Sequence, residues 1–168
     1  MARPMDRVSV AIDQWRRECP ELELLPMELT ARLGAVSRHI THDYLEPFFN
    51  ERGVQSREFD VLATLRRAGE PYALTPTQLF KVLMFSSGGM TNQLDRLEKA
   101  GLIARRPNPD DRRSMLVTLT EAGLELVDST IAPHVDNEAR ALSPLSDEEQ
   151  RTLNALLAKL MGGLEADM

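Results

Sequence analysis

The sequence predicts a mainly α-helical protein with one small β-hairpin. Apolar residues recur every three or four positions through most of the 168 residues, as they do on the buried face of a helix. Only the region after Gly101 changes to the pattern of two short strands around a polar segment. Charged residues make up 27% of the chain and apolar residues 42%, which is typical of one globular domain.

The N-terminal part of the chain predicts two helices. A short helix or arm contains Val8 and Trp15 and ends before Pro20. From Met27 onward the apolar residues keep helical spacing, which predicts one long helix with Pro47 near its end.

Two short helices are predicted next. Ser56 is placed to cap the first, which carries an inward apolar stripe that includes Phe59. The second begins at Thr75, whose hydroxyl can cap the helix while the side chain of Gln78 reaches back. This helix is expected to run to about Met84.

A third short helix has two different faces. Ser86 and Ser87 offer N-caps, and Gly101 ends the helix. On a helical projection of residues 86–100, the apolar side chains fall together at Met90, Leu94 and Leu97. The opposite face carries Gly88, Asn92, Asp95, Arg96 and Lys99. We expect the first face to pack and the second to be available for binding.

The hairpin follows directly, and two more helices complete the chain. Residues 102–106 and 115–119 predict two strands, and the loop PNPDDRR at 107–113 is too long for a tight turn, so it should project into solvent. Thr120 then caps a long helix that Pro133 is expected to bend.

The last predicted helix has a broad apolar surface. Ser146 and Glu149 form a capping box at its start. The helix that follows is too apolar to bury one stripe and leave the rest in water, so we expect it to pack against a partner surface.

The charge distribution points to one segment that binds a polyanion. The net charge is −6, but Lys and Arg number 6 in residues 1–51, 11 in 52–113 and 3 in 114–168, against 9, 7 and 10 Asp and Glu. The nets are therefore −3, +4 and −7. A basic middle segment between acidic flanks is what phosphate contacts would require, although surface charges can also cluster without function.

Two short helices followed by a basic hairpin make a winged helix-turn-helix, in which the second helix enters the major groove of DNA. Asn and Arg side chains can bond to adenine and guanine edges, and a glycine at a helix N-terminus lets backbone amides approach a phosphate. Arginines at a loop tip suit the minor groove. The candidate DNA-binding residues are Ser86, Ser87, Gly88, Thr91, Asn92, Arg96, Lys99, Arg106, Arg112 and Arg113.

Asp111 is expected to have a structural role in the loop, where it would orient the guanidinium groups of neighbouring arginines. Two less specific interpretations stay open for this region. The helix could be an ordinary solvated amphipathic helix, and the loop could be a self-neutralising surface turn.

The segment SSGGMTNQLDRLEKAGLIARRPNPDDRRSMLVTLTEAG, residues 86–123, resembles the core of the MarR family of bacterial transcriptional regulators. The resemblance rests on the helix predicted over residues 86–100, called here the reading helix, and on the Asp-x-Arg element at Asp111 and Arg113. It also rests on the Leu-Thr-x-x-Gly motif that ends at Gly123. It implies a homodimer whose N- and C-terminal helices interleave. It also implies repression of transcription until a small ligand or an oxidant changes the spacing of the reading helices.

Three regions are expected on this basis. Residues 1–52 form an N-terminal arm and the first dimerisation helix, 53–120 the winged helix-turn-helix domain, and 121–168 the C-terminal dimerisation helices. A twofold dimer presents two identical helices, so the operator should be an inverted repeat in double-stranded DNA with half-site centres about 10 bp apart.

The N-terminal extension is similar to that of the urate-responsive branch of the family. That resemblance places a ligand near Trp15, Asp60 and Arg105, while Gln93 stands where the branch has an arginine. Loss of that charge disfavours urate, so another small aromatic or phenolic effector is an equal candidate. Trp15 could instead be a packing anchor and Asp60 part of an ion pair.

Other function classes find little support in the sequence. There is no phosphate-binding loop or nucleophile elbow, so we do not expect an enzyme, and neither a metal nor a cofactor is expected. Cys19 leaves an oxidant sensor open, although a spectator thiol is favoured. A winged-helix protein-interaction module is also open, since Asp95 lies on the reading face. The chain lacks a secretion signal or membrane span, which predicts a cytoplasmic protein.

Overall fold

The computed structural model describes residues 6–83, 87–111 and 113–166. The chain divides into two compact units, Met1–Tyr44 and Leu45–Met168, and each is described by itself. This division follows contacts within the chain. The division by function into residues 1–52, 53–120 and 121–168 has other boundaries, and it stays a prediction.

The N-terminal unit is a pair of helices in contact with each other, α1 (Arg7–Glu18) and α2 (Leu25–His39). The predicted first helix is therefore confirmed. Ile12 of α1 and Leu24 just before α2 are buried. Asp6 caps α1 by accepting a hydrogen bond of 2.7 Å from the backbone N–H of Ser9.

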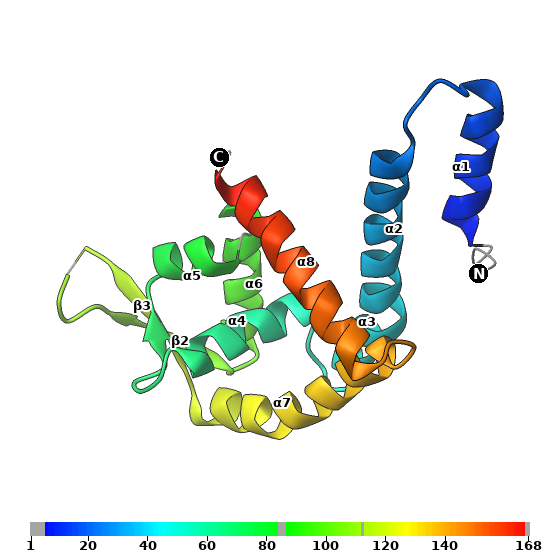
Figure 1. Ribbon diagram of the computed structural model, residues 1–168. Coiled ribbons are helices and arrows are strands. Elements are labelled where there is room, and N and C mark those ends of the chain that lie inside the picture. Colours follow the sequence, from blue (N-terminus) through cyan, green and yellow to red (C-terminus); the bar gives the residue numbers. More distant parts are fainter. Residues whose placement is uncertain (1–5, 84–86, 112, 167–168) are drawn as a thin grey trace. The chain divides into compact units, whose positions relative to one another are not determined.

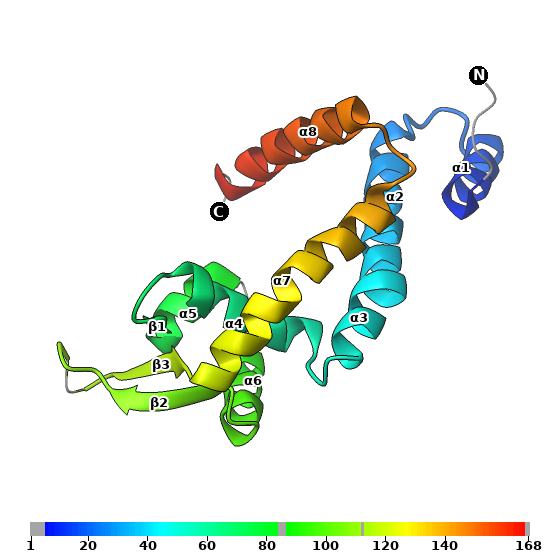
Figure 2. The same ribbon diagram turned by 90° about the horizontal axis from the view of Figure 1, so that it is seen from below.

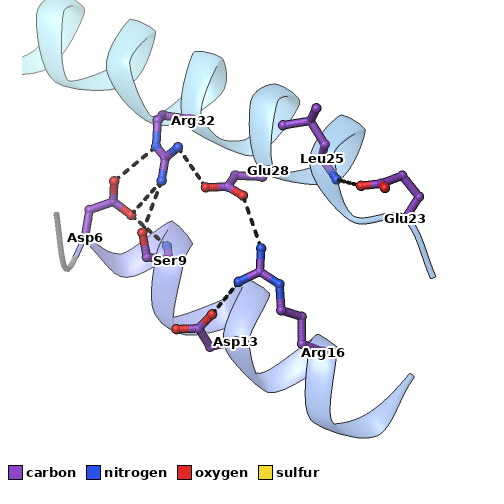
Figure 3. Close-up of polar contacts among 8 residues, drawn as sticks. All are labelled: Asp6, Ser9, Asp13, Arg16, Glu23, Leu25, Glu28 and Arg32. Carbon is purple, nitrogen blue, oxygen red and sulfur yellow. Dashed lines mark hydrogen bonds and ion pairs between the residues drawn. The ribbon is translucent and has the colours of Figure 1, made fainter. Parts of the chain in front are cut away.

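A polar network joins the two helices (Figure 3). Arg32 of α2 donates to Asp6 Oδ2 at 3.1 Å, to Ser9 Oγ at 3.1 Å and to Glu28 Oε1 at 2.9 Å. Arg16 of α1 lies 3.9 Å from the other oxygen of Glu28 and 2.8 Å from Asp13. The nearly buried carboxylate of Glu28 thus contacts an arginine from each helix.

The long helix predicted from Met27 is present, but it is not α-helical throughout. α2 ends at His39, a π-helical segment η1 (Ile40–Leu45) follows, and a short helix α3 (Glu46–Asn50) continues the chain. The physical reason is Pro47, which has no backbone N–H to donate to the preceding turn. A wider π turn before it accommodates that loss.

Between residues 56 and 119 the second unit contains three helices and a small sheet (Figure 1). The helices are α4 (Ser56–Arg67), α5 (Pro76–Leu83) and α6 (Ser87–Lys99). The strands are β1 (Ala73–Leu74), β2 (Ile103–Pro107) and β3 (Met115–Leu119), which form an antiparallel sheet in the order β1-β3-β2. The predicted hairpin of β2 and β3 is confirmed, with Ile103 opposite Leu119 and Pro107 opposite Met115.

The core of this unit collects buried side chains from α3, α4, α5, α6, the sheet and α7 (Glu121–Leu142). It includes Phe49, Phe59, Leu62, Leu65, Leu79, Met90, Leu94, Leu97, Ile103, Val117 and Val127. Because α4 supplies several of these residues and contacts α5, α6, α7 and β3, it is the central helix on which the others are placed.

Most of the predicted helix caps are confirmed. The backbone N–H of Thr75 donates to Gln78 Oε1 at 2.8 Å, and the N–H of Gln78 donates to Thr75 Oγ1 at 3.2 Å. Thr120 accepts from the N–H of Gly123 at 3.1 Å at the start of α7. Ser56, however, is the first residue of α4 and not its cap, because Gln55 occupies the cap position.

Gly123 is required by a close approach of two backbones. A Cβ atom at this position would collide with the carbonyl oxygen of Leu102. That carbonyl accepts a hydrogen bond of 3.1 Å from the N–H of Thr120, which holds the hairpin against the start of α7. The glycine of the Leu-Thr-x-x-Gly exit therefore keeps the wing close to the helix that follows it.

The last helix, α8 (Asp147–Ala166), begins with the predicted capping box, in which the N–H of Ser146 donates to Glu149 at 2.8 Å. None of its described residues is buried, and its large apolar side chains are 37% to 60% exposed. Within the described ranges, no helix is both long and apolar enough to cross a membrane.

Candidate nucleic-acid interface

The predicted division of α6 into two faces is confirmed. Met90, Leu94 and Leu97 are buried in the core. The exposed face carries Thr91, Asn92, Asp95, Arg96 and Lys99. Of the predicted phosphate-binding residues at the N-terminus of the helix, Ser87 and Gly88 begin α6, and Ser86 lies outside the described residues.

Asn92 and Lys99 are the residues of this face that remain available. Among the described contacts, no hydrogen bond or ion pair uses either side chain. An amide that both donates and accepts can bond to an adenine edge, and an ammonium can pair with a phosphate. The exposed face of α6 can therefore provide one base contact and one backbone contact.

Arg96 has a partner inside the protein. Its Nε lies 2.8 Å from Oε1 of Glu58 on α4, a side chain that is only 5% exposed. The second oxygen of Glu58 accepts the backbone N–H of Gln55 at 2.7 Å, so this carboxylate is shared between a helix cap and the ion pair. Arg96 therefore ties α6 to α4, and its guanidinium is not free in the way that the sequence suggested.

Arg105 is also engaged, although it was expected near a ligand. Its side chain extends from β2 and pairs with two carboxylates of α6. Nη2 lies 2.6 Å from Asp95, and Nη1 lies 2.9 Å from Glu98. Its backbone N–H donates to the other oxygen of Glu98 at 3.1 Å. The hairpin and α6 are thus joined midway along β2.

The loop of the wing is held by backbone contacts. Asp111 Oδ1 accepts the backbone N–H of Arg113 at 3.0 Å, and the carbonyl of Asp111 accepts the N–H of Ser114 at 3.0 Å. Asn108 binds Ser114 through both its backbone and its side chain. Asp111 was expected to orient guanidinium groups, whereas its described hydrogen bonds shape the turn through the backbone.

Two described arginines of the wing remain exposed, Arg106 near the end of β2 and Arg113 in the loop. Neither guanidinium pairs with another side chain among the residues that the structure describes. Arg112, another predicted contact, lies outside those residues. In both views of the molecule the hairpin projects away from the helices of its unit (Figure 2), as an element that reaches a DNA groove must.

The residues expected to hold an effector do not share described contacts. Trp15 is 46% exposed on α1, in the N-terminal unit. Asp60 lies on α4 and interacts electrostatically with His134 of α7 and with Arg67. Gln93 has a buried side-chain oxygen that accepts no hydrogen bond from the described atoms.

The carboxyl of Asp60 has an unusual environment. Partial withdrawal from water raises the pKa of Asp60, although the residue as a whole remains exposed. The nearby His134, Arg67 and Arg57 act in the opposite direction, and the desolvation outweighs them. This carboxyl therefore keeps its proton to a higher pH than a freely solvated aspartate.

An aromatic cluster that the sequence did not reveal surrounds His134. The centroid of its ring lies 5.8 Å from that of Phe48, 5.0 Å from Phe49 and 5.6 Å from Phe59. Its Nε2 is 3.4 Å from Glu138, and its Nδ1 is buried without a hydrogen-bond partner among the described atoms. His134 was only one of three scattered histidines in the sequence, and helical spacing gave no signal for long-range packing.

Comparisons with known proteins place the chain among regulators. A profile of the MarR family matches residues 52–114. The chain is 43% identical over 160 residues to the HTH-type transcriptional regulator PecS of Dickeya dadantii, with 95% of each protein covered. It is 33% identical over 141 residues to the multiple antibiotic resistance protein MarR of Salmonella typhimurium, covering 83% of this chain and 93% of that protein.

The fold is also similar to that of a solved regulator structure. A solved structure of a mutant of Escherichia coli MarR complexed with operator DNA superposes with a TM-score of 0.71 and 28% identity, covering 87% of this chain and 96% of that one. The predicted fold, mainly helical with a small antiparallel sheet, is therefore confirmed by the structure and by this similarity.

Proposed function

Because the chain belongs to the MarR family of transcriptional regulators, we propose that it binds an inverted-repeat operator as a homodimer and represses transcription until a small aromatic or phenolic effector releases it. Membership in this family makes the chain a DNA-binding regulator of transcription and not an enzyme. The operator, the dimer, the repressor role and the effector are the parts that we propose.

The observation that carries the proposal is the exposed face of α6 beside the wing. Asn92 and Lys99 are exposed and uncommitted within the described residues, and Arg106 and Arg113 lie on the hairpin that follows α6 directly. A helix presents these groups to a major groove while the hairpin reaches the neighbouring minor groove. Thr91 lies on the same face and completes the proposed contact set.

The homodimer is supported by two apolar helix surfaces that the described chain leaves exposed. On α2 the stripe consists of Leu25, Leu29, Leu33 and Val36. On α8 it consists of Leu153, Leu156, Leu157, Leu160, Met161 and Leu164. Contiguous exposed leucines on two helices are unusual for a monomer and typical of an interface between copies of a chain.

The effector is proposed from the surroundings of Asp60. A carboxyl with a raised pKa, near a histidine that packs against three phenylalanine rings, suits an aromatic molecule with a hydroxyl group. An anion such as urate is less suitable, since Gln93 carries no charge and Arg105 is already paired with Asp95 and Glu98. The contribution of Trp15 from α1 stays a prediction.

The proposal is tested by binding to the DNA upstream of the gene that encodes the chain. We expect the full chain to shift this DNA in preference to a random duplex, and the affinity to fall steeply as salt rises. Arg113→Ala and Lys99→Ala should each weaken binding. Each should also make the dependence of log Kobs on log salt shallower by about 2, because the dimer then neutralises two phosphates fewer, one for each protomer.

The same assay distinguishes the alternatives. Addition of aromatic acids or phenols should release the complex, and urate should release it less well. A chain that binds the upstream DNA no better than random DNA, with variants that behave like the wild type, would instead be a protein-interaction module.

A further inference from the structure

The reading helix, α6, has two acidic and two basic side chains, but one of the basic side chains is paired with a residue outside the helix. Its described charged residues are Asp95, Arg96, Glu98 and Lys99. Arg96 is engaged by Glu58 of α4, which is a nearly buried carboxylate. Lys99 is then the one cation of α6 without a described partner inside the protein, against two carboxylates. A helix in this state would repel the phosphates that flank a major groove.

Arg105 compensates both carboxylates from the neighbouring strand. One guanidinium nitrogen lies 2.6 Å from Asp95 and another lies 2.9 Å from Glu98, while the backbone N–H of Arg105 fixes Glu98 at 3.1 Å. An isolated surface ion pair contributes little, but a cation shared by two carboxylates forms a network with fixed geometry. The side chain of Arg105 is only 28% exposed, so its charge is less accessible to a ligand than the charge of the exposed Arg106.

We propose that Arg105 is a positioning residue for DNA binding: it neutralises Asp95 and Glu98, so that the exposed face of α6 can approach the phosphates. The inference rests on the proposed DNA-binding function. It assigns Arg105 a role through α6, whereas the sequence had placed it at the effector. Asp95 then belongs to the DNA-binding apparatus as a charge that must be covered, and it is not evidence for a protein partner.

Two other roles would use the same contacts differently. Arg105 could bind a phosphate directly, in which case its own charge matters and its partners do not. It could also be a mechanical clamp between wing and helix, in which case removal of either side of the ion pairs would be equally harmful. These roles make different predictions for variants that remove the carboxylates.

The test compares five full-length variants on the upstream DNA and on a random duplex of the same length: Arg105→Ala, the double variant D95N/E98Q, the triple variant R105A/D95N/E98Q, Arg106→Ala, and Arg106→Ala combined with D95N/E98Q. We expect Arg105→Ala to weaken binding by roughly tenfold or more, because two uncovered carboxylates per protomer then face the DNA. D95N/E98Q should bind as tightly as the wild type or more tightly. The triple variant should recover to within about threefold of the wild type.

Arg106→Ala is the matched control, since it removes the same charge one residue along β2, from a side chain with no described partner. Its loss of affinity should persist when D95N/E98Q is added. Thermal unfolding and sedimentation of each variant check that fold and oligomeric state are retained.

Two results would overturn the proposal. A triple variant as weak as Arg105→Ala would mean that Arg105 contacts DNA itself, and a D95N/E98Q variant as weak as Arg105→Ala would mean a mechanical clamp. The random duplex keeps the two claims separate. If the wild type shows no preference for the upstream DNA but the triple variant still recovers on random DNA, the operator proposal fails and the role of Arg105 stands.

Discussion

Among single residues, Glu58 is an acidic side chain that is nearly buried and depends on its hydrogen-bond donors. Its carboxylate is nearly buried and has two described donors, the backbone N–H of Gln55 and the guanidinium of Arg96. Burial of a charge is tolerated only when the charge is paired and hydrogen-bonded. The contact therefore links the stability of α4 to the residue of α6 that the sequence placed on DNA.

We predict that Arg96→Ala lowers the free energy of unfolding by about 1.5–3 kcal/mol, the usual contribution of a hydrogen bond to a charged group. Urea denaturation measures it. Arg113→Ala is the control and should leave the stability unchanged, since its guanidinium is exposed. An Arg96→Ala variant as stable as the wild type would contradict a structural role for this pair.

Asp60 provides a prediction of pH dependence. Its pKa is raised above the usual 3.8, chiefly by withdrawal from water. The folded protein thus holds this proton to a higher pH than the unfolded chain, and the free energy of unfolding falls as pH rises through that window. We expect Asp60→Asn to be more stable than the wild type at neutral pH, and the difference to vanish below 3.8.

Denaturant unfolding across this pH range measures the effect of Asp60. Asp136→Asn, which changes an exposed carboxylate of α7, is the control. A loss of stability in Asp60→Asn at neutral pH would mean that attraction to His134, Arg67 and Arg57 outweighs the desolvation.

At the scale of elements, attachment of α1 to α2 depends on charge. The N–H of Ser9 and the guanidinium of Arg32 lower the pKa of Asp6 from 3.8 to about 2. A depressed pKa means that the contribution to stability is present above 3.8 and is lost as pH falls through about 2. The network of Figure 3 should therefore hold at neutral pH and fail in strong acid.

We predict that Asp6→Asn increases hydrogen exchange of the backbone amides of α1 at neutral pH, because the helix loses its charged cap and its link to Arg32. Glu18→Gln, at the other end of α1 and outside this network, should leave exchange unchanged. Equal protection in Asp6→Asn and the wild type would show that apolar contacts alone hold α1.

Elements that depend on residues close together in the sequence could be predicted from it. Elements that depend on contacts with distant parts of the chain could not. The caps at Thr75, Thr120 and Ser146 depend on side chains within three residues, so the sequence contains them. β1 has only two residues and exists because Ala73 and Leu74 pair with β3. A strand so short has no periodicity of its own to detect.

The same distinction applies to the candidate site. Helical spacing predicted which residues of α6 are exposed, because that depends on one helix. It did not predict that Arg96 meets Glu58 or that Arg105 meets Asp95, since these pairs join different elements. Charge alone therefore gave Arg96, Arg106 and Arg113 the same standing as DNA contacts, and the structure separates the paired Arg96 from the exposed Arg106 and Arg113.

At the scale of the whole molecule, the exposed leucines of α8 predict the oligomeric state. A double substitution, Leu156→Glu and Leu160→Glu, should convert a dimer to a monomer while the winged-helix unit stays folded, because neither side chain is buried in the described chain. Sedimentation equilibrium measures the mass, and circular dichroism measures the helix content.

Ala155→Glu is the control for this change, since it places a glutamate on the polar face of the same helix, α8. It should leave the dimer intact and DNA binding unaffected. A double-glutamate variant that remains dimeric would contradict an interface through α8.

The central claim is that two copies of α6, related by twofold symmetry, read one face of a duplex. Selection of binding sites by the full chain from a library of random duplexes tests it most directly. The account predicts enrichment of inverted repeats whose half-site centres lie about 10 bp apart, one turn of DNA. Enrichment of single, unpaired half-sites, or of no sequence at all, would contradict it.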